Sequence, residues 1–506
     1  MQGGAMLTSA QILQILQEYN LLTDLEPAKK ALAPEKTFPQ VTNDSRQIQP
    51  GAVFVAISGA AVDGHKFITQ AAKQGAALVI SEVPCNDDLP ATANNIIVKN
   101  SYQTFALLCE AHYSYPTTGM SGFAITGTNG KTTSAMIIRH LLKHSEHSCG
   151  MLSTVEYDLG NGLIESADRT TPQAADLFKY FRQMQQNNLT DFVMEISSHA
   201  LAQHRIGSVK FQAAVFTNLT EDHLDYHHTM SEYFKVKQTL FTHHLHADGI
   251  AVINCDDPFG MELAAGKAVR NVLSFGIQHG QWRIVDIENS GDHTAFALTD
   301  GHEKHHFVCP LSGLHNIYNI AGAVLALAAT GKVSLPESGR ILSSQPFSVP
   351  GRLEKFSLSN GAKVFVDYAH TDDALKNVLS CLKQLMPQQL ICVFGAGGDR
   401  DRAKRPLMGK AAAAYADTIY LTSDNPRSED PEAIIEAIRS GIPDDFAAAN
   451  LHIIPDRSEA IRQALLNASS NDVILIAGKG HETYQEVAGK KYHFDDREAV
   501  RSFIRN

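Results

Sequence analysis

The chain has 506 residues, a formal net charge of −11 at pH 7, and a composition of 44% hydrophobic and 19% charged residues. This composition is that of an ordinary globular protein, and at roughly 150 residues per domain the length suggests three domains. The acidic balance, without any Lys- or Arg-rich run, argues against nucleic acid or an anionic membrane as the main partner.

The seven cysteines are scattered along the chain, and no two of them form a CxxC pair. This distribution predicts reduced thiols, a cytoplasmic location, and neither a zinc site nor a disulfide framework. No apolar run approaches the length of a membrane span, so membrane insertion is not expected.

Residues 1–115 are predicted to form a small α/β domain. Ile12, Ile15 and Leu16 have the spacing of one helix face. Short apolar runs predict strands over 53–57, 77–80 and 95–98.

The next segment, 116–348, contains an apolar run, Phe123–Ile125, that leads into a Gly-rich turn and a helical pattern. Strand, turn and helix N-terminus together form a phosphate cradle, in which Lys131 reaches the nucleotide phosphates and Thr132 can hold Mg²⁺. The usual P-loop has its first glycine where this chain has Ile125, so a chance Gly-rich turn is the alternative. The residues predicted to surround the phosphates of ATP are Gly127, Thr128, Asn129, Gly130, Lys131, Thr132 and Thr133.

Further strands of this segment are predicted over 191–196, 213–217 and 250–254. They are nearly continuous apolar runs, which is typical of a parallel sheet covered on both faces. The polar, His-rich segment 280–306 predicts a β excursion instead of another crossover.

Two strand ends in this segment carry candidate metal ligands. Glu195 lies at the end of one strand, where a carboxylate can bind the Mg²⁺ that bridges nucleotide phosphates, and a solvated loop acid is the alternative. His223 lies in a stretch dense in His and Asp that follows the next strand, which indicates metal and phosphate chemistry. A zinc site competes, but neither cysteines nor an HExxH motif occur there. From spacing alone, Lys235 and Lys237 belong to a solvated helix face.

For three other polar residues, the sequence allows two roles each. Arg205 would suit an anionic substrate or simply the surface. Asn316 and Asn319 open an Ala-rich helical stretch, where they would read a purine edge or cap the helix, and spacing does not separate the two.

Residues 349–506 are predicted to form a Rossmann-like domain, because five apolar runs alternate with helical stretches. The predicted strands are 364–367, 390–394, 418–421, 452–454 and 473–476. Ligands of such sheets bind beyond the carboxyl ends of the strands. Arg400 and Arg427 lie there as fork-shaped donors for a carboxylate, and Glu482 can pair with an ammonium, so an amino-acid-like ligand is predicted. An exposed Arg427 in a simple turn is the alternative.

Together these motifs resemble the Mur ligases, ATP-dependent enzymes that form amide bonds in peptidoglycan precursor synthesis. The resemblance covers nearly the whole chain. It is carried by Gly127–Thr133, Glu195–His199, Asn218–Tyr226, His315–Asn319, Pro350–Arg352, Asp367–His370 and Gly478–Glu482. It implies an α/β protein with a small uridine-nucleotide domain, a central P-loop ATPase-like parallel-sheet domain and the Rossmann-like domain. The shorter glycine spacing of the phosphate loop is the one this family has.

Within the family, the chain most resembles the members that add the third amino acid of the peptide. Asp44-Ser45-Arg46, with Pro50-Gly51 and Asp63-Gly64, matches their uridine-nucleotide domain. The residues matching contacts to the UDP-linked muramoyl dipeptide are Ser45, Arg46, Thr170, Thr171, Ser197, Gln203 and Arg205. Those assigned to ATP beyond the phosphate loop are Asn316, Asn319, Arg352, Asp367 and His370.

The family implies a carbamylated lysine that binds a second Mg²⁺ together with His223. The matching residue is Lys237, or Lys235 if the alignment slips by two. One departure concerns the segment after His370, where Thr371-Asp372 replaces the usual Thr-Pro and is expected to leave the loop less rigid.

The acceptor amino acid is predicted to be meso-diaminopimelate. Arg427 would attract its extra carboxylate and repel a lone ammonium, and the Asp-Asn-Pro-Arg sequence is that of diaminopimelate-adding members. L-lysine is the alternative. The expected contacts are Arg400, Asp424, Asn425, Arg427, Gly478 and Glu482.

The predicted reaction passes through an acyl phosphate and serves cell-wall growth, cell shape and division. A monomer acting on small molecules is expected, with closure about Pro350–Gly351. A folylpolyglutamate synthetase, which needs no uridine-binding domain, and a P-loop regulatory ATPase, which needs no amine acceptor, are the competing interpretations.

Overall fold

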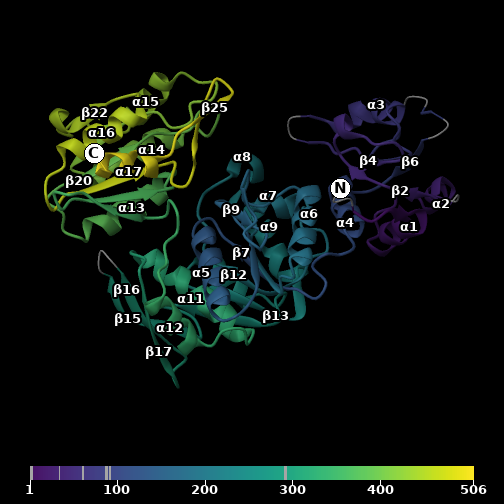
Figure 1. Cartoon of the computed structure of the whole chain (residues 1–506), viewed down its shortest axis with the longest axis horizontal. Helices are drawn as coiled ribbons and strands as arrows, with labels where there is room; N and C mark the ends of the chain where they lie inside the picture. Colours follow the sequence, from purple (N-terminus) through teal and green to yellow (C-terminus); the bar gives the residue numbers. More distant parts are fainter. Residues whose placement is uncertain are drawn as a thin grey trace.

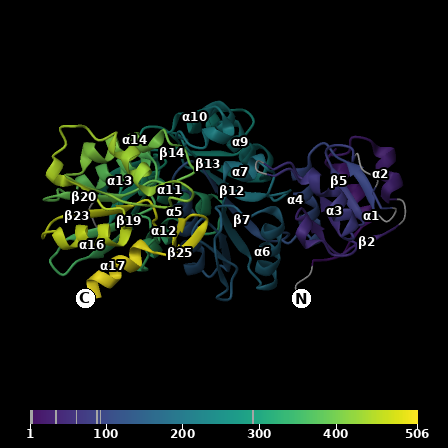
Figure 2. The same cartoon turned by 90° about the horizontal axis from the view of Figure 1, so that it is seen from above.

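The computed structural model describes residues 4–32, 35–59, 62–85, 89–90, 93–289 and 293–505. Three α/β units follow one another along the chain, with sheets of four, eleven and six strands (Figure 1). Seen from above, the units lie in a row with the central one between the other two (Figure 2). This confirms the predicted three-part α/β architecture.

The first unit has a parallel sheet in the order β3-β4-β5-β6. Its strands are β3 (Val41–Thr42), β4 (Val53–Val55), β5 (Leu78–Ser81) and β6 (Asn94–Ile97), with a separate pair β1 (Leu7–Thr8) and β2 (Thr37–Phe38). Its helices are α1 (Ser9–Glu18), α2 (Leu25–Leu32), α3 (Ile68–Lys73) and α4 (Ser101–His112). The predicted helix face is confirmed, because Ile12, Ile15 and Leu16 are buried in α1.

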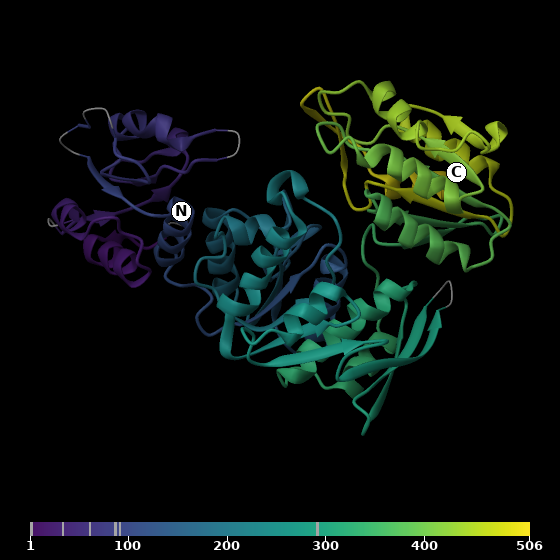
Figure 3. The ribbon, with the colours of Figure 1, turned by 180° about the vertical axis from the view of Figure 1, so that it is seen from behind.

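The central unit is built on one sheet whose middle is parallel and whose ends are antiparallel, in the order β10-β9-β8-β11-β7-β12-β13-β14-β15-β16-β17. The inner strands are β7 (Ser121–Thr126), β8 (Cys149–Leu152), β11 (Asp191–Glu195), β12 (Phe211–Phe216), β13 (Leu245–Asn254) and β14 (Val272–Gly276). The outer strands are β9 (Glu156–Asp158), β10 (Ile164–Ser166), β15 (Trp282–Asn289), β16 (Thr294–Thr299) and β17 (Lys304–Cys309). The predicted β excursion is therefore the meander β15–β17, which extends from the central unit when the molecule is seen from behind (Figure 3).

Both faces of this sheet are covered, which explains the continuous apolar runs. Phe123 and Ile125 of β7 pack with α5 and α11 in one cluster, whereas Ala124 between them belongs to the cluster on the opposite face. The helices of this unit are α5 (Lys131–His144), α6 (Ala174–Gln186), α7 (Ser198–Ala202), α8 (Leu224–His227), α9 (Met230–His243), α10 (Pro258–Ala265), α11 (Leu314–Ala329) and α12 (Leu335–Ser344).

The third unit has the strand order β18-β19-β23-β20-β21-β22, parallel except for β18. Its strands are β18 (Glu354–Ser357), β19 (Lys363–Asp367), β20 (Leu390–Phe394), β21 (Thr418–Leu421), β22 (Leu451–Ile453) and β23 (Val473–Ala477), followed by the hairpin β24 (Tyr484–Val487) and β25 (Lys490–His493). Its helices are α13 (Asp372–Lys383), α14 (Lys404–Tyr415), α15 (Pro431–Arg439), α16 (Arg457–Asn467) and α17 (Asp496–Arg505). Helices α13–α15 cover one face and α16–α17 the other.

The late strand β23 lies between β19 and β20. Parallel pairing therefore brings the loops after β19, β23, β20 and β21 to one edge of the sheet. No helix formed by the described residues has the length and apolarity that a membrane span needs.

Candidate active site

The phosphate loop joins β7 to α5 in a backbone conformation that requires glycine. Gly127 and Gly130 have φ angles of +149° and +86°. A Cβ on Gly127 would lie 1.9 Å from Thr217 Oγ1, and one on Gly130 would lie 2.2 Å from Asn319 Oδ1. Helix α5 begins directly after Gly130, so its first N–H groups face an anion placed at the loop.

The loop after β12 braces the phosphate loop from the side. The N–H groups of Thr128 and Asn129 donate to Asn218 O and Oδ1, at 3.0 and 2.9 Å. Thr217 Oγ1 donates to Asn129 O at 2.6 Å. Asn218 therefore shapes the loop, a role that its place in the sequence did not reveal because it depends on the neighbouring strand.

Lys131 and Glu195 face the same cavity as Thr132. Lys131 Nζ lies 3.0 Å from Gly127 O and 2.8 Å from Thr128 O, and burial lowers the pKa of this amine. The register of β11 on β7 pairs Glu195 with Ile125, just before the loop. The buried Glu195 carboxylate accepts from the N–H and Oγ1 of Thr154, at 2.8 and 3.0 Å.

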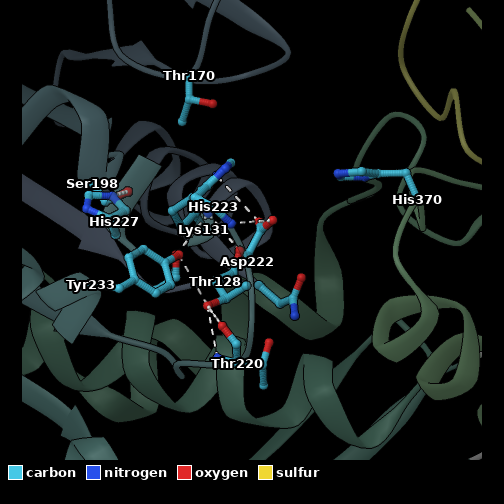
Figure 4. A network of polar contacts seen from close by, with 12 residues as sticks. Thr128, Lys131, Thr170, Ser198, Thr220, Asp222, His223, His227, Tyr233 and His370 are labelled. Carbon is cyan, nitrogen blue, oxygen red and sulfur yellow. Dashed lines mark hydrogen bonds and ion pairs between the residues drawn. The ribbon is translucent and has the colours of Figure 1, made fainter. Parts of the chain in front are cut away.

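His223 lies in an aromatic and imidazole cluster beside the loop (Figure 4). Its Nε2 is 3.4 Å from an Asp222 oxygen, and its ring contacts that of His199 edge-on, with centroids 4.9 Å apart. Burial lowers the pKa of His223 to about 4, against the opposing charge of Asp222. The buried His227, whose Nε2 is 2.8 Å from Ser198 Oγ, stacks on Tyr233.

Lys237 is buried, and Lys235, two residues earlier on α9, is exposed. Lys237 Nζ donates to Gly127 O at 3.0 Å and lies 4.7 Å from the Tyr233 ring centroid. Burial, followed by the charge of Lys131, holds the pKa of Lys237 well below its usual range. The solvated face that spacing suggested for Lys237 is wrong, because α9 packs this side against the sheet.

A cavity of about 680 Å³ lies between the central and third units. Every predicted ATP-binding residue lines it except Gly127, and the next residue, Thr128, does. Glu195 and His223 line it as well. Helix α13 forms a further wall of the cavity. The sequence did not predict this, because the pattern of an amphipathic helix does not show which cavity its residues line. Its lining residues include Ala374, Asn377, Val378 and Cys381.

The third unit brings charged groups to the residues of the central unit that line this cavity. Arg352 Nη2 donates to Thr132 Oγ1 at 3.3 Å, and its guanidinium lies 4.5 Å from the Tyr368 ring centroid. Lys404 Nζ reaches Asp222 Oδ1 at 3.0 Å, a contact that sequence reasoning also missed. His370 stands apart from the residues of the central unit (Figure 4).

A second cavity, of about 710 Å³, lies between the first and central units. Four of the residues predicted for the UDP-linked substrate line it: Ser45, Arg46, Gln203 and Arg205. Arg205 Nη1 donates to Thr171 O, and Thr171 Oγ1 donates to Glu195 O, at 3.0 and 2.8 Å. Ser197 N donates to Thr171 Oγ1 at 3.0 Å, and Thr170 lines the first cavity. These contacts connect the two cavities.

The predicted amino-acid site gathers at the carboxyl edge of the third sheet. Arg427 has a φ angle of +52°, and its Nη1 donates to Gly398 O at 2.6 Å. Its backbone pairs with the β24–β25 hairpin, and its Nε lies 3.3 Å from Glu486 Oε2. Arg427 is thus anchored and is not the exposed arginine of a simple turn.

The remaining predicted residues lie close by. A Cβ on Gly397 would be 3.0 Å from Arg427 Nη1 and 3.8 Å from Arg400 Cγ, so the two arginines flank this glycine. Asn425 Nδ2 donates to Glu482 Oε2 at 2.9 Å. A Cβ on Gly478 would be 2.6 Å from an Asp424 oxygen.

Within the described part of the chain, no group of three or more His, Cys, Asp and Glu side chains is arranged to hold a metal ion.

The fold and the cavities define a three-unit α/β protein whose central unit carries a glycine-rich loop at a helix N-terminus. Three family models match it: "Mur ligase family, catalytic domain" over residues 37–113, "Mur ligase middle domain" over 125–327 and "Mur ligase, glutamate ligase domain" over 351–480. The chain belongs to the Mur ligase family.

Several relatives carry the name UDP-N-acetylmuramoyl-L-alanyl-D-glutamate–2,6-diaminopimelate ligase. The protein of Bacillus cereus is 39% identical over 480 residues, covering 93% of this chain and 95% of the relative. That of Gloeobacter violaceus is 42% identical over 467 residues, covering 92% and 93%. A solved structure of a ligase with this name matches at 33% identity with a TM-score of 0.65, covering 93% of this chain and 95% of that one.

More distant structures share the fold. The MurF ligase of Thermotoga maritima in complex with ADP matches at 19% identity with a TM-score of 0.59, covering 92% of this chain and 97% of that one. The folylpolyglutamate synthase of Mycobacterium tuberculosis complexed with ADP and AMPPCP also matches at 19% identity, with a TM-score of 0.61. It covers 79% of this chain and 95% of that one.

Proposed function

We propose that the protein is an ATP-dependent ligase that adds meso-diaminopimelate to UDP-N-acetylmuramoyl-L-alanyl-D-glutamate. The relatives that carry this activity in their name span more than nine tenths of the chain. The structural observation that carries the proposal is that Arg427 and the Asn425–Glu482 contact lie at the same edge of the third sheet. This edge offers one cation for a carboxylate and one carboxylate for an ammonium.

ATP would place its phosphates over the phosphate loop, where Lys131 and the first N–H groups of α5 offset their charge. Thr132 and Glu195 supply buried oxygen ligands to the same cavity, a donor set that fits Mg²⁺. His223 and a carbamylated Lys237 would hold a second ion. Bound Mg²⁺ would neutralise charge on the transferring phosphoryl group.

Carbamylation of Lys237 needs an uncharged amine, because the nitrogen lone pair attacks CO₂ and a proton leaves. The buried position and lowered pKa of Lys237 favour that form. The exposed Lys235 has neither property, so we assign the modification to Lys237.

The reaction would proceed in two steps. The γ-carboxylate of the D-glutamyl residue attacks the γ-phosphorus of ATP, the bond to ADP breaks, and an acyl phosphate forms. The acceptor amine then attacks the acyl carbon, loses a proton, and inorganic phosphate leaves. The contacts from Arg205 through Thr171 to Glu195 support a path for the dipeptide between the two cavities.

We assign the uridine-nucleotide domain to residues 1–115, the ATP domain to 116–348 and the amino-acid domain to 349–506. Closure would turn about Gly351, which has a φ angle of +63° and whose added Cβ would lie 2.1 Å from His481 N. The scattering profile of the protein should become more compact with an ATP analogue and dipeptide substrate, and an unchanged profile would refute the hinge. The seven cysteines are scattered along the chain without a CxxC pair, which supports a cytoplasmic location, and we expect a monomer.

Phosphate release from ATP tests the proposal. Release should require both the UDP-linked dipeptide and meso-diaminopimelate, with the tripeptide product identified by mass. Release with L-lysine instead would keep the ligase and overturn the role of Arg427. Release that depends on neither amino acid would favour a regulatory ATPase.

A further inference from the structure

The loop after β23 contains a lysine to which the proposed reaction assigns no part. Lys479 has no exposed surface. Its Nζ lies 3.2 Å from Asn425 Oδ1 and 3.2 Å from Glu482 Oε2. A buried ammonium is costly unless it is paired, so these contacts require an explanation beyond packing.

The contacts of Lys479 determine how the Asn425 amide is oriented. Asn425 Oδ1 accepts from Lys479 Nζ and also from Glu486 N, at 3.2 and 2.9 Å. An ammonium has only donors, so the amide oxygen must face it. The amide nitrogen is thereby turned toward Glu482 Oε2, to which it donates at 2.9 Å.

Lys479 also supplies the positive charge that pairs with Glu482, because the neighbouring arginines pair with other carboxylates. Arg427 pairs with Glu486 at 3.3 Å, and Arg457 pairs with Asp496 at 2.8 Å. Among the described residues, the ion pair of Glu482 is with Lys479, and its hydrogen bonds fall on Oε2. Oε1 of the same carboxylate is left to receive N–H groups of a ligand.

We infer that Lys479 is a positioning residue of the acceptor site, whose ammonium holds the Asn425 amide against Glu482 and so directs the Glu482 carboxylate toward the ammonium group of the incoming amino acid. This inference rests on the proposed ligase function. Lys479 itself is sealed from solvent, so it acts through these two side chains. Without its charge, the Asn425 amide is free to turn over and Glu482 loses its cationic partner.

The test compares Lys479→Met with Lys491→Met. Both ammonium groups lie over the ring of Tyr484, at 5.7 and 4.0 Å from its centroid, but Lys491 is exposed. Lys479→Met should raise the KM for meso-diaminopimelate about 10- to 100-fold, the range for hydrogen bonds to charged groups. The KM for ATP and for the UDP-linked dipeptide should stay within about twofold, as should all constants of Lys491→Met.

A double-mutant cycle with Glu482→Gln shows whether the lysine acts through the carboxylate. Lys479→Met combined with Glu482→Gln should lose little more in kcat/KM for the acceptor than Glu482→Gln alone. Fully additive losses would overturn the inference, as would an unchanged acceptor KM in Lys479→Met or an equal rise in the KM of all three substrates.

A replacement variant and a wild-type control separate misfolding, and failure of the proposed function, from failure of this inference. If the melting curve shows that Lys479→Met does not fold, Lys479→Gln, which keeps a donor without the charge, replaces it with the same expected acceptor KM. If the wild-type enzyme releases phosphate without need of an amino acid, the proposed function fails first. If the wild-type enzyme is a ligase and the Lys479 variant has the wild-type KM for meso-diaminopimelate, the proposed function stands and this inference is refuted.

Discussion

Arg457 and Asp496 form an ion pair in which neither side chain has exposed surface. Arg457 Nε and Nη2 each lie 2.8 Å from a carboxylate oxygen. Nη2 also donates to Ala477 O at 2.8 Å. The pair therefore ties α16 and α17 to the end of β23, directly before the acceptor loop.

Replacing Arg457 with Met should lower the free energy of unfolding of the third unit by about 3–5 kcal/mol, because Asp496 would remain buried without its partner. Urea unfolding followed by circular dichroism measures this. Arg462→Met is the control, since its pair with Glu459 is exposed and should contribute less than about 1 kcal/mol. Equal losses of unfolding free energy in the two variants would show that burial does not set the contribution of the Arg457–Asp496 pair.

Gly130→Ala should weaken nucleotide binding at least about tenfold, because the new Cβ would strike Asn319 and close the cradle. Titration calorimetry with a non-hydrolysable ATP analogue reports the affinity. Gly162→Ala introduces a methyl at a comparable φ angle of +77° with nothing within 4 Å, so it separates backbone strain from the clash. Unchanged affinity in Gly130→Ala would mean that phosphates do not bind there.

Lys237→Met should lower kcat by about 100-fold or more, the scale of losing one group that stabilises developing charge. Lys235→Met, on the exposed side of α9, should leave kcat within about twofold. Steady-state phosphate release with both substrates saturating compares them. A larger effect at Lys235 would reverse the assignment of the modified lysine.

Glu110 should make stability depend on pH. This buried carboxylate of α4 accepts from Ser208 N and Oγ, at 2.8 and 2.9 Å, and burial raises its pKa to about 7 from 4.5. The folded state then binds more protons than the unfolded state between these two values. Its stability should therefore fall as pH rises from about 4.5 to 7, by about 3 kcal/mol for this one group.

Glu110→Gln, which keeps an oxygen for Ser208, should remove this contribution and be the more stable protein at pH 8. Urea unfolding at pH 5 and pH 8 gives the difference between wild type and variant. Glu26→Gln, on the exposed surface of α2, should leave the difference unchanged. The same pH dependence in wild type and Glu110→Gln would show that other groups cause it.

Local sequence patterns were enough to predict the phosphate loop, several core strands and the class of chemistry. Apolar runs predicted strands such as β7 and β23 because strand and helix periods are local properties. The glycines before Lys131 predicted the phosphate loop, since only a backbone with positive φ angles packs so closely. Arg427 and Glu482 were found because each lies in a loop that follows a strand of a parallel sheet.

Which of those residues meet, and which are buried, depends on how the whole chain folds. Lys235 and Lys237 look alike in the chain, and the packing of α9 alone separates them. Lys479 is 54 residues from Asn425, and Lys404 is 182 residues from Asp222. Such partners are set by strand order and by the seating of one unit on another, which no local pattern encodes.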